Sequence, residues 1–131
     1  MRRAKQISAW VEDRPGMLGK VADALGEKKI QIRAFMAAKL DGRGFVRVVV
    51  DRPAAALKVF ESHGWETTED EMLEETVPDR PGALGRIADR LGAAGINIQY
   101  AYVGTARSTS RVNLYLAVAD PAAALQALRR A

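Results

Sequence analysis

The chain has 131 residues, of which 48% are apolar and 27% charged, and its net charge is +4. This composition excludes a disordered or fibrous protein. No stretch approaches the roughly 20 apolar residues of a membrane helix, and Glu12 interrupts the N-terminus before a signal-like segment develops, so we expect a cytoplasmic protein without a membrane partner. With no cysteine and a single histidine, we expect no disulfide, thiol nucleophile, metal site or cofactor.

The acidic residues are unevenly distributed. Residues 61–79 hold eight of the sixteen acids and no Lys or Arg. The rest of the chain is basic enough to attract nucleic acid or an anionic ligand, although solvated faces and good solubility are the simpler interpretation. The acids between Glu69 and Glu75 lack the glycine-containing spacing of a calcium loop, and we interpret them as a solvated junction.

The first half of the chain changes periodicity in a fixed order. Residues 5–12 place apolar side chains at alternate positions, as a half-buried strand does. A helix follows, with apolar residues at the i, i+3, i+4 and i+7 positions Leu18, Val21, Ala22 and Leu25. Residues 30–36 and 44–50 predict two more strands, and Pro53 begins a second helix. Residues 65–69 complete this half as a fourth strand.

The second half of the chain repeats the first. Residues 13–32 and 79–98 are identical at twelve of twenty positions, and residues 48–60 resemble residues 116–128. A repeat of this length that occurs only twice indicates a duplicated domain and not a solenoid.

Each half therefore predicts the order β-α-β-β-α-β, the ferredoxin-like arrangement of two helices on one face of an antiparallel sheet. We expect an α+β protein of two tandem modules, residues 1–69 and residues 70–131. The second module lacks its last strand, because no strand pattern follows the helix that begins at Pro121. One sheet edge would stay unpaired unless another segment or subunit covers it.

The sequence Asp-Arg-Pro-Gly occurs at residues 13–16 and again at residues 79–82, each time directly before a predicted helix. Proline suits a first helical turn, and aspartate can accept hydrogen bonds from the free N–H groups there. Glycine in that turn costs up to about 1 kcal/mol relative to alanine, which indicates that something approaches the backbone. Free N–H groups suit a carboxylate, and the aspartate suits an ammonium group. An amino acid carries both groups, although a purely structural turn explains the same residues.

The sequences DRPGMLGKVADALGEKKIQI and DRPGALGRIADRLGAAGINI resemble the opening of the ACT domain, a small regulatory module that binds amino acids. The resemblance covers nearly the whole chain as two tandem copies. It implies a ligand site between two modules, formed by the strand-to-helix loop of one and the second strand of the other. On this chain it implicates Asp13, Gly16, Met17 and Leu18 with Asn97, and Asp79, Gly82, Ala83 and Leu84 with Gln31.

The first copy departs from the family pattern, because Lys29 and Gln31 stand where the second copy has Gly95 and Asn97. We therefore expect the pocket that pairs the Asp13 loop with Asn97 to bind one ligand per chain more tightly than any second ligand. The resemblance implies a non-catalytic sensor that acts through a separate partner or through self-association, and we expect a homodimer.

Two other functions fit parts of the pattern. RNA-binding RRM domains share the strand order, and Arg43-Gly44-Phe45 is similar to their aromatic signature, but no further ring follows, so we do not expect nucleic acid. A structural protein-interaction module without a ligand is the other alternative. Catalysis is not expected, because His63 stands at a predicted helix end and the serines around Ser108 have no activating neighbour.

Overall fold

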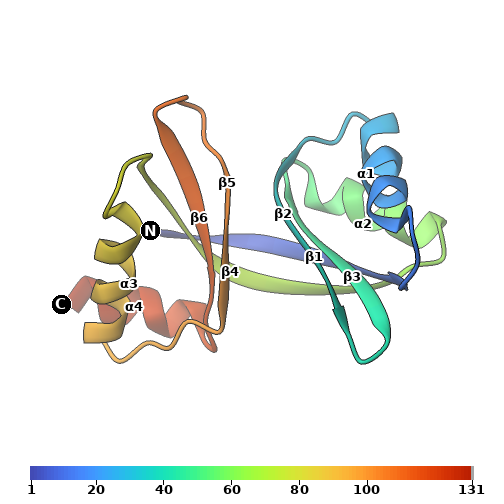
Figure 1. Ribbon diagram of the computed structural model, residues 1–131. Helices are drawn as coiled ribbons and strands as arrows, with labels where there is room; N and C mark the ends of the chain where they lie inside the picture. The colour runs from blue at the N-terminus through green and yellow to red at the C-terminus, as the bar shows by residue number, and fades with distance from the viewer. Residues whose placement is uncertain (131) are drawn as a thin grey trace. The chain divides into compact units, whose positions relative to one another are not determined.

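The computed structural model describes residues 1–130, in which six strands and four helices follow one another (Figure 1). In chain order they are β1 (Arg2–Glu12), α1 (Met17–Glu27), β2 (Ile32–Leu40), β3 (Arg43–Val50), α2 (Pro53–Ser62), β4 (Glu66–Pro78), α3 (Ala83–Ala93), β5 (Tyr100–Thr105), β6 (Arg111–Ala117) and α4 (Pro121–Arg130). No helix in this range combines the length and the apolar character that a membrane span requires.

The chain divides into two compact units. The first, called here the N-terminal unit, consists of Lys5–Asp70. The second, called the C-terminal unit, combines Met1–Ala4 with the chain from Glu71 onward. Strands β1 and β4 therefore contribute residues to both units.

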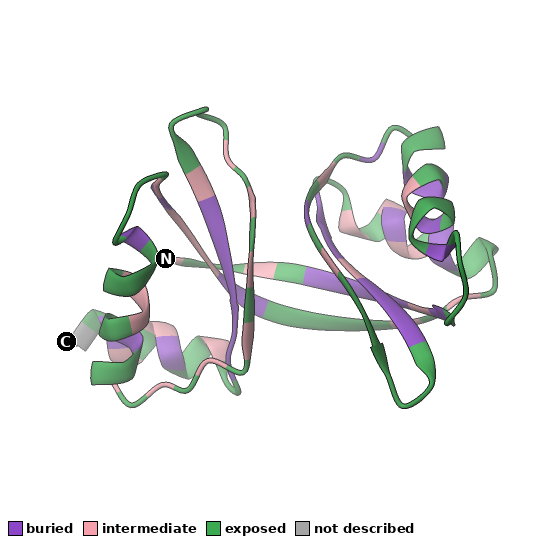
Figure 2. Cartoon of the chain, viewed as in Figure 1, coloured by how far each residue is buried: buried purple, intermediate pink, exposed green. Residues whose placement is uncertain are grey.

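In the N-terminal unit, β3 pairs antiparallel with both β1 and β2, and α1 and α2 lie together on one face of these strands (Figure 1). Residues 6–9 of β1 are buried without interruption, and buried residues form stripes on the two helices (Figure 2). The core combines these strand and helix residues, among them Ile7, Ala9, Val11, Val21, Leu25 and Phe60. Burial of each large apolar side chain contributes about 1.5–3 kcal/mol, which makes this core the main stabilising feature of the unit.

In the C-terminal unit, β6 pairs antiparallel with both β4 and β5. Helices α3 and α4 lie on one face of these strands (Figure 1). The core again combines alternate strand residues with helix residues, among them Leu73, Leu91, Leu116, Ala124 and Leu128.

Residues Met1–Ala4 supply the strand that the second half of the chain lacks. They include the start of β1, and β1 neighbours β4 in the sheet order. The Met1 ammonium nitrogen lies 2.9 Å from Glu75 Oε2. Arg2 Nη2 donates a hydrogen bond of 2.9 Å to Glu74 Oε1. The sheet edge that was predicted to be unpaired is therefore covered by the start of the chain.

The prediction of two tandem ferredoxin-like modules, each with its own antiparallel sheet, is wrong. The strands follow the order β1-β3-β2-β5-β6-β4 in one closed barrel. The physical reason lies in β4, where residues 65–69 and the segment after them were predicted as two strands. Residues 66–69 and that following segment belong to one strand of 13 residues, whereas Trp65 lies just before it. No glycine or proline occurs between residues 65 and 77, so no turn-forming residue interrupts the extended backbone.

The β4 acids that were interpreted as a solvated junction are exposed from Glu69 to Glu71, where the two units divide, but they lie in an unbroken strand and pair with the basic start of β1. Arg3 Nη1 lies 3.3 Å from Glu71 Oε2, and Lys5 Nζ lies 3.3 Å from Glu69 Oε1. Exposed pairs of this kind are worth about 0–1 kcal/mol each. Together they oppose a shift of one residue in the pairing of β1 with β4. Such a shift would turn every side chain of the strand to the other face of the sheet. Among residues 1–130, no three acids or histidines gather closely enough to hold a metal ion.

The buried face of α1 is rotated from the predicted one. The helix begins at Met17, and Met17, Val21 and Leu25 are buried at the i, i+4 and i+8 positions. Leu18, predicted as a core residue, is 43% exposed, and Leu84 at the equivalent position of α3 is 54% exposed. Both leucines therefore lie at the surface beside the DRPG turns.

Replacement of Asp70 by proline tests whether β4 is one strand. Proline removes a backbone N–H and fixes φ at about −65°, which a strand hydrogen-bonded to a neighbour tolerates poorly. We expect Asp70→Pro to lower the free energy of unfolding, measured by urea titration, by on the order of 2 kcal/mol. Asp70→Ala should change it little. If the segment were a solvated junction, both variants would unfold at the same urea concentration.

Candidate functional site

The two DRPG turns have nearly the same backbone conformation. Gly16 and Gly82 are the N-cap residues of α1 and α3, with φ angles of 89° and 87°. These angles lie in the left-handed region, where a side chain is strained. No atom lies within 4 Å of a Cβ built on either glycine, so the surrounding space is open. The backbone path of the turn, and not the close approach of a neighbouring atom of the chain, accounts for both glycines.

The aspartates of the turns do not cap the helices, contrary to the prediction. Neither α1 nor α3 has a side-chain hydrogen bond at its N-cap. The Asp13 carboxylate instead lies 3.2 Å from Lys39 Nζ on β2. Asp79 is exposed, and its backbone N–H donates to Ser110 O at 2.9 Å.

Uncapped helix starts leave backbone donors available. The first hydrogen bond of α1 runs from Lys20 N–H to Gly16 O at 3.0 Å, and that of α3 from Arg86 N–H to Gly82 O at 3.1 Å. The N–H groups immediately before these residues have no partner inside the helix, and they lie at the positive end of the helix dipole. Both turns can therefore attract a carboxylate or another small anion.

The structure brings the predicted site residues together in two groups. One group lies in the N-terminal unit at the start of α1, with Met17 buried and Asp13, Gly16 and Leu18 exposed. The other group lies in the C-terminal unit at the start of α3, with Ala83 buried and Asp79, Gly82 and Leu84 exposed.

The two predicted amide contacts, Gln31 and Asn97, each lie just before a strand and not within one. Asn97 is exposed and precedes β5, which begins at Tyr100. Gln31 precedes β2, and its side-chain amide donates to Ile32 O at 3.0 Å. Asn97 and the Asp13 turn belong to different units, as do Gln31 and the Asp79 turn, and their pairing stays a prediction.

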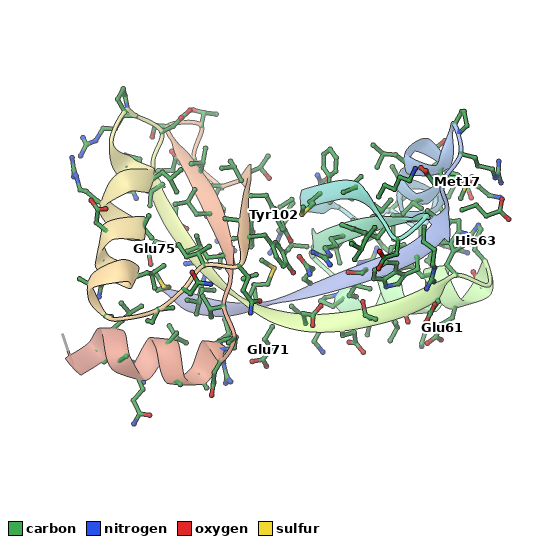
Figure 3. The ribbon with its side chains drawn as sticks, turned by 60° about the horizontal axis from the view of Figure 1, so that its bottom comes forward. Met17, Glu61, His63, Glu71, Glu75 and Tyr102 are labelled. Atoms are coloured by element: carbon green, nitrogen blue, oxygen red, sulfur yellow. The ribbon has the colours of Figure 1, made fainter. Side chains whose placement is uncertain are left out.

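A cavity of about 600 Å³ lies beside the first DRPG turn, entirely within the N-terminal unit. Its walls come from the end of β1, the turn, the start of α1, the β2–β3 turn and the connection from α2 to β4. Asp13 and Met17 of the predicted site line it. Figure 3 shows Met17 and His63, another lining residue, at the same end of the unit. A volume of this size is typical of small-molecule sites.

The cavity has aromatic walls whose rings are held in place. The imidazole of His63 is stacked on the indole of Trp65, with ring centroids 4.6 Å apart and an interplanar angle of 15°. The guanidinium carbon of Arg43 lies 4.9 Å from the centre of the Trp10 ring. Trp10 Nε1 donates a hydrogen bond of 3.3 Å to Thr68 Oγ1. Such contacts restrict the rings before any ligand arrives, which lowers the entropy cost of binding.

Sequence reasoning missed most of this cavity. Trp10 and Trp65 are the two tryptophans of the chain, and one stands shortly before the DRPG turn while the other follows Gly64. In a split β-α-β arrangement, the end of the first strand and the start of the fourth lie at the same end of the sheet. That rule, applied to the predicted strands, would have placed both indoles together.

The structure also bears on the RNA-binding alternative. Phe45, the aromatic residue of that pattern, is 6% exposed. Its ring packs against Trp10 at a centroid distance of 5.4 Å, and the Arg47 guanidinium carbon lies 4.2 Å from its centre. Base stacking needs an exposed ring face, so this residue does not form an RRM-type platform. His63 is the C-cap residue of α2, as predicted from the sequence.

Comparison with known protein families finds a match for part of the chain. Residues 74–131, which include the second DRPG turn, match the family model of the ACT domain. One ACT domain is found in this chain. The match covers α3, β5, β6 and α4, whereas the resemblance of the first DRPG segment to the same family stays a prediction. No protein of curated function matches the sequence.

Several solved structures have the same fold. Protein BT0572 from Bacteroides thetaiotaomicron is 24% identical, with a TM-score of 0.84 over 98% of this chain and 88% of that one. The ligand-free regulatory subunit of aspartate kinase from Thermus thermophilus is 21% identical, with a TM-score of 0.68 over 97% and 91%. The corresponding subunit from Thermus flavus is 21% identical, with a TM-score of 0.59 over 98% and 91%. At these identities the likeness concerns the fold alone.

Alanine substitutions at Gly16 in the first turn and at Gly19 in the helix that follows should change the free energy of unfolding in opposite directions. Gly16→Ala places a Cβ at a left-handed φ and should lower the free energy of unfolding by about 1 kcal/mol. Gly19→Ala, inside α1 where an added Cβ meets no atom, should raise it by about 0.5 kcal/mol. Urea titration of the two variants measures both changes. Equal effects would contradict the assignment of Gly16 as a left-handed N-cap.

Proposed function

We propose that the protein is a non-catalytic regulatory protein that binds a small molecule of the amino-acid type at its DRPG turns. The observation that carries the proposal is the uncapped, glycine-opened start of α1 and α3, with an aspartate carboxylate three residues before each glycine. The ACT match of residues 74–131 supports it, because that segment contains one of these turns. The free N–H groups take the carboxylate of the ligand, and the aspartate takes its ammonium group.

The favoured ligand position combines the Asp13 turn with the side-chain amide of Asn97. Gln31 is the weaker counterpart for the Asp79 turn, because its amide already donates to the backbone of β2. The ligand ammonium group replaces Lys39 as the partner of the Asp13 carboxylate, since both are primary ammonium cations. One ligand per chain therefore binds more tightly than any second one.

The repeat supports a duplicated ACT sequence, with copies at residues 1–69 and 70–131 that share the strands of one fold. Proteins of this fold include the regulatory subunit of aspartate kinase from Thermus thermophilus. By analogy with that protein, the output of ligand binding here passes to a separate partner or to self-association as a homodimer. The ligand increases the population of whichever conformation of the protein it contacts best. This population shift is how ligand binding changes the output.

Thermal denaturation in the presence of each common amino acid, at millimolar concentration, tests the proposal. A ligand that binds only the folded state raises the melting temperature, and the rise grows with the logarithm of the ligand concentration above Kd. At least one amino acid should produce a concentration-dependent rise. Absence of a shift with every amino acid would contradict the proposal.

Matched variants then locate the site by calorimetry with the amino acid that gives the largest shift. Asp13→Asn and Asn97→Ala should each weaken binding by about tenfold or more, because each removes a hydrogen bond to a charged group. Gln31→Ala is the control and should leave the tight site unchanged. Two equal sites per chain, or unchanged binding in Asn97→Ala, would show that the site is elsewhere.

A further inference from the structure

We propose that the cavity between Trp10 and Trp65 is a second ligand site, which shares Asp13 and Met17 with the proposed amino-acid site, and that it takes a planar aromatic carboxylate. The cavity is formed within the N-terminal unit alone. It therefore needs no residue from the C-terminal unit and does not depend on the pairing of the Asp13 turn with Asn97.

The aromatic part of the ligand follows from the rings that line the cavity. Trp10, His63 and Trp65 all line one space of about 600 Å³. His63 Nδ1 lies 3.0 Å from Val59 O, so its N–H donates a hydrogen bond to that carbonyl. The Trp65 indole is held from a second direction by Phe60, with ring centroids 5.9 Å apart. Fixed rings of this kind favour a flat, unsaturated ligand over a saturated one, because stacking requires a planar partner.

The charge of the ligand follows from the balance of charged groups around the cavity. Its lining acids already have cationic partners, because Glu66 pairs with Arg43, Glu12 pairs with Arg14 at 2.9 Å, and Asp13 pairs with Lys39.

Lys20 is different, since its ammonium group has no ion-pair partner among the residues that the structure describes. A ligand carboxylate can pair with this ammonium group.

The two halves of the repeat are not equivalent at this place. Thr76 stands at the repeat position of Trp10, and its hydroxyl donates a hydrogen bond of 2.6 Å to Asn113 Oδ1. The C-terminal unit therefore does not present an indole at the end of its corresponding strand. Only one site of this kind per chain is expected from the part of the chain that the structure describes.

Intrinsic tryptophan fluorescence provides a direct readout, because the chain has two tryptophans and both line the cavity. Benzoate is the probe, benzamide is the neutral probe of the same shape, and cyclohexanecarboxylate is the charged probe without a flat ring. Benzoate should change the emission with a saturable dependence on concentration. The other two probes should bind about tenfold more weakly, as expected for the loss of one charged or stacked contact. Equal responses to benzoate and benzamide, or no saturable response, would overturn the proposal.

Lys20→Gln and Arg86→Gln form the matched pair of variants, since Arg86 holds the repeat position of Lys20 in α3. Lys20→Gln should weaken benzoate binding by about tenfold and leave the response to benzamide unchanged. Arg86→Gln should bind benzoate as the unchanged protein does. Equal benzoate affinity in all three proteins would overturn the assignment of Lys20.

The test is independent of the proposed amino-acid site. Asn97→Ala removes part of that site and should not alter benzoate binding, whereas Lys20→Gln should not alter the thermal shift with an amino acid. If one proposal fails, its own readout is lost while the readout of the other proposal is kept. The two failures can therefore be told apart. Unchanged unfolding midpoints of the variants confirm that each is folded.

Discussion

The structure depends on one continuous strand, β4, which runs from Glu66 to Pro78 beside the basic start of β1. The uneven charge of the sequence has its explanation here, because the acids of β4 pair with the N-terminal ammonium group and with Arg2, Arg3 and Lys5. Each exposed pair contributes little free energy, but the set fixes which residues lie opposite each other. The two units thus share strands that neither could provide alone.

Much of the local structure can be predicted from the sequence, whereas the strand order cannot. Alternating apolar residues locate β1 and β3, and the helical periodicity locates α1 and α3, because these patterns reflect local geometry. Periodicity does not reveal which strand pairs with which, so the closed order and the strand supplied by Met1–Ala4 were missed. The absence of glycine and proline between residues 65 and 77 was a readable signal for one long strand.

The site was predictable to a similar extent. The DRPG turns identify the helix starts, and the ACT match covers the second of them. The pairing of Asp13 with Lys39, and the cavity beside it, depend on which strand ends lie together in three dimensions. Asp13 belongs to the proposed amino-acid site and also lines the cavity.

Hydrogen–deuterium exchange of the backbone amides from residue 66 to residue 78 tests the central claim most directly. An unbroken strand beside β1 protects the amides that donate to that neighbour. The account predicts protection within residues 69–71 comparable to that of the β4 residues on either side. Rapid exchange at these three residues, with protected amides on either side, would show two strands joined by a loop and would contradict it.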